Sequence, residues 1–169
     1  MLEDLASFIT IAEIAGVFVG FAALISVTRR SEIEAAHLAQ IQAVVSIGLM
    51  VVVAALVPVA LGAYNIDDHG LWVTSSLVYL VLNWGVILIA LRRPQNRQLA
   101  TAQAASSPIT TTLFWLLELA IQVPLLLAVF GVNRELDIAF YLTALVVHLF
   151  EAAFILAQLV YAQVGRHQA

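Results

Sequence analysis

Five long apolar runs dominate the chain, and short polar stretches separate them. The runs cover residues 5–27, 41–63, 71–91, 110–130 and 138–160. Each has about 20 residues or more, which is long enough for an α-helix to cross a hydrocarbon core of about 30 Å. Their length and their lack of apolar–polar alternation exclude transmembrane strands. The pattern predicts an all-α integral membrane bundle of five transmembrane helices.

Composition extends this prediction to the whole chain. Hydrophobic residues make up 63% of the 169 positions and charged residues 11%, roughly half the charged share of a globular protein. A soluble core of this length cannot bury so much apolar surface. Nearly every residue lies in or next to a run, so we expect a single membrane domain over residues 1–169. Its surroundings would be the lipid bilayer, and we expect no nucleic-acid partner.

The basic residues predict an orientation. All seven are arginines, and alternating spans place six of them on one side, namely Arg29, Arg30, Arg92, Arg93, Arg97 and Arg166. The positive-inside rule assigns that side to the cytoplasm. The N-terminus would then lie outside and the C-terminus inside. The first run lacks a preceding basic segment and is longer than a signal peptide's apolar region, so we expect it to be a retained helix.

Two prolines interrupt the predicted second and fourth helices. Pro58 and Pro124 remove the helical hydrogen bonds of the carbonyls four residues earlier, which belong to Ala54 and Ala120. Carbonyls freed at membrane depth line some ion sites, but prolines are also common in membrane helices that simply pack. Both interpretations remain open.

Four ionisable side chains fall near the middle of the predicted spans: Glu13, Glu118, His148 and Glu151. By helical rise, all four lie within about 4 Å of the span centres. A charged side chain near a helix centre costs about 2.5–3.5 kcal/mol on the insertion scale, so such residues are rare and usually functional. These four are the candidate groups of a proton or cation pathway.

Helical spacing adds supporting polar groups. His148 and Glu151 share a face at i and i+3, and Glu118 shares one with Gln122 at i and i+4. The supporting side chains that we predict are Tyr79, Asn83, Gln122 and Tyr141. In the first run, Gly16 and Gly20 form a Gly-x-x-x-Gly pair, which predicts close packing of another helix.

The charges inside the spans do not balance. Three carboxylates accompany one histidine, and no arginine or lysine lies within any run. The glutamates must be protonated, bind a cation, or meet basic groups from another subunit. The first two outcomes favour a proton or cation channel or transporter. The third favours a structural or accessory subunit of a membrane complex.

The sequence lacks the residue patterns of common cofactor sites and hydrolytic enzymes. A single histidine within the spans is too few for bis-histidine haem, and the diiron pattern of two Glu-x-x-His motifs is absent. His-Glu-x-x-His and Gly-x-Ser-x-Gly are also absent. We therefore expect no enzymatic activity, no cofactor and no bound metal centre. The protein would act as a homo-oligomer or with a partner membrane protein.

One segment resembles known proteins. The first run reads Ala12-Glu13-Ile14-Ala15-Gly16, continues to Gly20-Phe21-Ala22-Ala23-Leu24 and is followed by Arg29-Arg30. This stretch resembles the first helix of small, uncharacterised bacterial membrane proteins of similar length. The resemblance implies a multi-pass protein of the bacterial cytoplasmic (inner) membrane and implies no activity.

Overall fold

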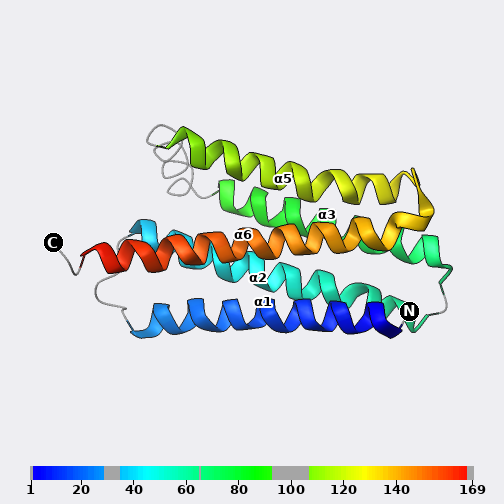
Figure 1. The fold of residues 1–169 in the computed structure, drawn as a ribbon, viewed down its shortest axis with the longest axis horizontal. Coiled ribbons are helices and arrows are strands. Elements are labelled where there is room, and N and C mark those ends of the chain that lie inside the picture. The colour runs from blue at the N-terminus through cyan, green and yellow to red at the C-terminus, as the bar shows by residue number, and fades with distance from the viewer. Residues whose placement is uncertain (1, 29–34, 65, 93–106, 167–169) are drawn as a thin grey trace.

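Five long helices lie side by side in the computed structural model (Figure 1). They are α1 (Leu2–Thr28), α2 (Ala35–Gly62), α3 (Asp68–Arg92), α5 (Pro108–Val129) and α6 (Asp137–Arg166), and the short 3-10 helix η1 (Arg134–Leu136) leads into α6. The structure describes residues 2–28, 35–64, 66–92 and 107–166. The prediction of five helices is confirmed, and only residues 63 and 130 of the predicted runs fall just beyond a helix.

Each long helix contains a segment of 22 residues or more that is apolar enough to cross a membrane. The fold is therefore compatible with a polytopic membrane protein. Orientation stays a prediction, because Arg29, Arg30, Arg93 and Arg97 lie outside the described residues.

The two ends of the bundle are named here by the residues they carry. At the His69 end, α1, α3 and α6 begin; at the Arg92 end, these three helices finish (Figure 1). Helices α2 and α5 run in the opposite direction. This alternation arises because each connection joins two helices at the same end.

Helix α6 is the central element of the bundle. It contacts α1, α2, α3 and α5, whereas α5 contacts chiefly α3 and α6. Figure 1 shows α6 between the α3–α5 pair and the α1–α2 pair. A polar side chain on the buried face of α6 is therefore surrounded by protein on several sides, which suits a buried site.

Packing between α1 and α2 depends on Gly48. A Cβ atom at this position would lie 2.5 Å from Val19 Cγ2 and 3.3 Å from the Ala15 carbonyl oxygen, so only glycine permits this approach. By contrast, a Cβ atom at Gly16 or Gly20 would meet no atom within 4 Å. Within the described residues, the close helix contact is made at Gly48 and not at Gly16 or Gly20, whose predicted packing against another helix stays a prediction.

The carbonyl freed by Pro58 has a partner inside the bundle. The hydroxyl of Tyr141, on α6, donates a hydrogen bond of 2.6 Å to the Ala54 carbonyl oxygen, and both residues are buried. This bond satisfies an acceptor that would otherwise lack a donor in an apolar interior. The geometry favours the packing interpretation of Pro58, and it gives Tyr141 a structural role.

Removing the Tyr141 hydroxyl is expected to destabilise the fold modestly. Tyr141→Phe leaves the Ala54 carbonyl without a donor, and we expect the free energy of unfolding to fall by about 0.5–2 kcal/mol. Unfolding by SDS in mixed micelles measures this change. Tyr161→Phe is the matched control, because Tyr161 is exposed on the same helix. Equal free energies of unfolding for the two variants would contradict a stabilising role for the Tyr141–Ala54 hydrogen bond.

Candidate functional site

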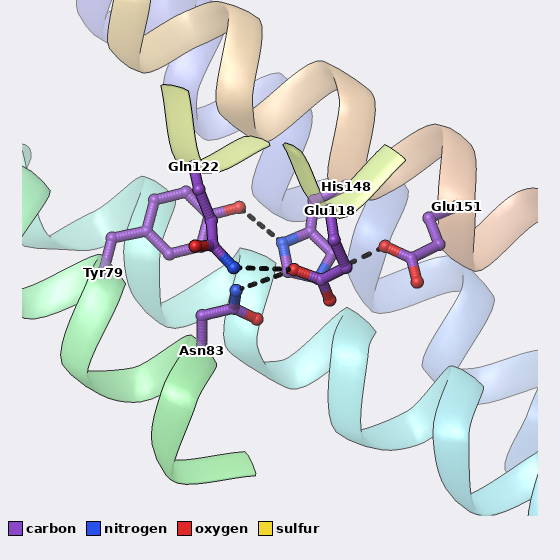
Figure 2. A network of polar contacts seen from close by, with 6 residues as sticks. All are labelled: Tyr79, Asn83, Glu118, Gln122, His148 and Glu151. Carbon is purple, nitrogen blue, oxygen red and sulfur yellow. Dashed lines mark hydrogen bonds and ion pairs between the residues drawn. The ribbon is translucent and has the colours of Figure 1, made fainter. Parts of the chain in front are cut away.

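Six polar side chains from three helices converge at the middle of the bundle (Figure 2). Helix α3 contributes Tyr79 and Asn83, α5 contributes Glu118 and Gln122, and α6 contributes His148 and Glu151. All except the partly exposed Gln122 are buried. These six residues are called the central cluster below. Five of them lie on faces that otherwise pack into the apolar core, so the cluster is enclosed by the fold.

Glu118 is held by two amide donors. Asn83 Nδ2 and Gln122 Nε2 donate hydrogen bonds of 3.1 and 3.3 Å to the same carboxyl oxygen, Glu118 Oε2. Gln122 reaches Glu118 across one turn of α5, and Asn83 reaches it from α3. Two N–H donors on one oxygen are an environment that stabilises a negative charge.

His148 joins the tyrosine to the second carboxyl group. Its Nδ1 atom lies 2.9 Å from the Tyr79 hydroxyl oxygen, and its Nε2 atom lies 3.7 Å from Glu151 Oε2. The Tyr79 and His148 rings are stacked with an angle of 16° between their planes. Each imidazole nitrogen thus faces an oxygen of an ionisable side chain, at 2.9 Å for Tyr79 and 3.7 Å for Glu151. An imidazole ring can accept a proton at one nitrogen and release one from the other.

Glu151 is the least satisfied member of the cluster. Its side chain is 1% exposed, and neither carboxyl oxygen has a hydrogen-bond partner among the described residues. A buried carboxyl group in this position requires a proton or a cation, since His148 alone is beyond hydrogen-bond distance.

The structure brings together three of the four predicted pathway residues and leaves one outside. Glu13 is exposed on the surface of α1, away from the central cluster. Tyr141 lies next to the cluster, because its ring packs 5.8 Å from that of Tyr79, but its hydroxyl is committed to Ala54. No group of three or more ligand side chains in the described part of the chain is arranged to hold a metal ion.

A second polar contact lies at the His69 end and was not predicted. His69 Nδ1 lies 2.7 Å from Asp137 Oδ2, and Asp137 is buried. His69 lies at the start of α3 and Asp137 at the start of α6, so no local spacing in the sequence connects them. The available signal was that α3 and α6 both begin at the same end of an alternating bundle.

No family model, curated protein or solved structure matches the chain. A function must therefore be inferred from the chemistry of the site. The central cluster combines one carboxyl group held by donors, one without donors and a histidine between proton-exchanging partners. This arrangement is suited to taking up and releasing a proton or a small cation.

Proposed function

We propose that the protein is a small polytopic membrane protein that moves protons or cations through the central cluster, with Glu151 as the exchanging group. The observation that carries the proposal is the burial of both Glu151 carboxyl oxygens without a hydrogen-bond donor. Such a group costs several kcal/mol in an apolar interior unless a proton or cation neutralises it. Where water reaches such a group, its neutralising proton or cation can be exchanged.

The geometry supports a route for a proton. A proton leaving Glu151 Oε2 would cross the 3.7 Å gap to His148 Nε2 through a bridging water molecule. The proton on His148 Nδ1 would then pass to the Tyr79 oxygen, while the Tyr79 hydroxyl proton goes to a second water molecule. Glu118, held by Asn83 and Gln122, is a second carboxyl group in the same cluster. The reverse sequence returns the proton to Glu151.

The oxygen atoms of the cluster support a cation as the alternative cargo. Carboxylate, amide and hydroxyl oxygens are the ligands that hard cations prefer. Glu118, Glu151 and Asn83 each bring such an oxygen to the centre of the bundle. In this case His148 would help to position Glu151 and would carry no proton.

Flux from proteoliposomes tests the proposal and separates the two cargoes. With an imposed pH or cation gradient, the parent protein is expected to give flux above that of empty vesicles. His148→Ala should lower proton flux at least tenfold if the histidine relays protons, and should lower cation flux less. No flux above empty vesicles under any gradient, from protein that remains helical and folded, would exclude transport.

The second candidate is an accessory or structural subunit, alone as a homo-oligomer or with a partner membrane protein. The observation that favours it is Glu13, which is exposed on α1 one turn before the open position Gly16 and two turns before the open position Gly20. A carboxyl group facing lipid is costly, and a polar group from another chain would reduce that cost. Folded protein without flux would favour this candidate. The bacterial inner membrane is the proposed location for both, and neither includes an enzymatic reaction.

A further inference from the structure

Apart from those of Glu151 itself, the described buried side-chain oxygens without a hydrogen-bond partner lie between Glu151 and the His69 end of the bundle. In the described part of the chain, the buried side-chain oxygens without a hydrogen-bond partner belong to Ser75, Ser76, Asp137 and Glu151. Ser75 and Ser76 lie on the first half of α3, and Asp137 lies at the start of α6, so all three are displaced from Glu151 toward the His69 end. Buried polar groups of this kind are usually satisfied by water.

Two side-chain contacts hold α3 and α6 together on this side. The first is His69–Asp137 at the end of the bundle, 2.7 Å, and the second is Tyr79–His148 at its centre, 2.9 Å. The two contacts are separated by about 15 Å along each helix. Between them, at matching depth, lie the small buried side chains of Ser76 and Ala144.

An aromatic layer crosses the same interval. Phe8, Trp72 and Tyr141 pack with ring centroids 5.7–6.0 Å apart. Trp72 follows His69 by one turn of α3 and Tyr141 follows Asp137 by one turn of α6, so the layer lies between the end of the bundle and Ser76.

An apolar cluster packs on the opposite side of Glu151. Toward the Arg92 end, α6 packs through Leu159 against Ala22 of α1 and against Ile41 and Val44 of α2. All four side chains are buried. Among the described residues, no buried polar atom in this half is without a partner. In the part of the chain that the structure describes, the unpartnered buried side-chain oxygens other than those of Glu151 itself therefore lie on the His69 side of Glu151.

We propose that Glu151 exchanges its proton or cation with the aqueous phase at the His69 end, past Asp137, Ser76 and His148, and that the Phe8–Trp72–Tyr141 layer closes this route. The identification of Glu151 as the exchanging group rests on the proposed function. The one-sided access rests on the packing of α3 against α6 and is tested without measuring transport.

Single cysteines provide the test, because the chain contains none. Ser76→Cys probes the route, and Ala22→Cys probes the apolar half. Ser76 lies about 12 Å from the start of α3, while Ala22 lies only about 9 Å from the finish of α1, so depth alone favours reaction at Ala22. The reagent is a membrane-impermeant methanethiosulfonate added to one face of sealed vesicles. It reacts with the thiolate, which forms in water and not in an apolar core.

Two surface cysteines report which face the reagent reaches. Glu135→Cys marks the His69 end and Arg92→Cys marks the other, since both residues are exposed. We expect Ser76→Cys to react at least tenfold faster than Ala22→Cys, and from the face that labels Glu135→Cys. Adding Trp72→Ala to Ser76→Cys should increase the rate further by opening the aromatic layer.

Reaction of Ser76→Cys from the Arg92 face, or at a rate no greater than that of Ala22→Cys, would overturn the inference. This comparison remains decisive even where Trp72→Ala disturbs folding. The two proposals fail separately. Labelling of Ser76→Cys without any flux from the parent protein would remove transport and leave the access route, whereas flux without labelling would remove the route and leave transport.

Discussion

Replacing Glu151 with glutamine is expected to reduce flux to the level of empty vesicles. Glutamine has nearly the same size and shape, so it fills the same buried space beside His148. It has no exchangeable carboxyl proton and no negative charge to bind a cation, and therefore neither cargo has an acceptor at this position. Proteoliposomes under a pH or cation gradient measure the effect.

Glu135→Gln is the matched control for this substitution. Glu135 lies in η1 and is exposed, so the same chemical change occurs outside the central cluster. Its flux should equal that of the parent. Glu151→Gln with parental flux would mean that the unpartnered carboxyl group has no part in transport, and the proposed role of the central cluster would be lost with it.

Introducing valine at Gly48 is expected to produce the largest loss of stability. A Cβ atom there would lie 2.5 Å from Val19 Cγ2, and Val19 is β-branched and has little rotamer freedom to withdraw. The Ala15 carbonyl oxygen, at 3.3 Å, belongs to the backbone of α1. Helix α1 must therefore move away from α2, and we expect the free energy of unfolding to fall by about 3 kcal/mol.

Gly16→Val separates this packing effect from the general cost or gain of replacing a helical glycine. Gly16 lies in α1 with no atom within 4 Å of a built Cβ, so its substitution should change the free energy of unfolding by less than about 1 kcal/mol. SDS unfolding of both variants gives the comparison. Equal stabilities would show that α1 and α2 do not pack closely at Gly48 in the folded protein.

The helices could be predicted well because their signals are local. Each apolar run is long enough to identify a spanning helix by itself, and the observed helices contain the predicted runs to within one residue at each end. Contacts within one helix were also predictable. His148 with Glu151 and Glu118 with Gln122 are found as expected, because spacings of three and four residues place two side chains on one helical face.

Contacts between helices were not predictable in the same way. Asn83 with Glu118 and His69 with Asp137 join residues far apart in the chain, and their pairing depends on how α3 packs against α5 and α6. The Tyr141 bond to Ala54 is a similar case, because a freed carbonyl indicates a possible acceptor without showing which donor will reach it. Sequence spacing carries no information about the rotation of one helix relative to another.

Glu13 and Glu118 show most clearly what the sequence determined and what the tertiary structure decided. Both are carboxyl groups near the centre of an apolar run, and the sequence by itself determined five spanning-length helices, the depth of their polar groups and an excess of carboxylates. Only the tertiary structure decided that Glu118 is buried among donors while Glu13 is exposed, and that Gly48 makes the close helix contact that Gly16 and Gly20 do not. The physical reason is that length and hydropathy act within each helix, whereas the face that a helix turns inward is selected by the combined packing of all five.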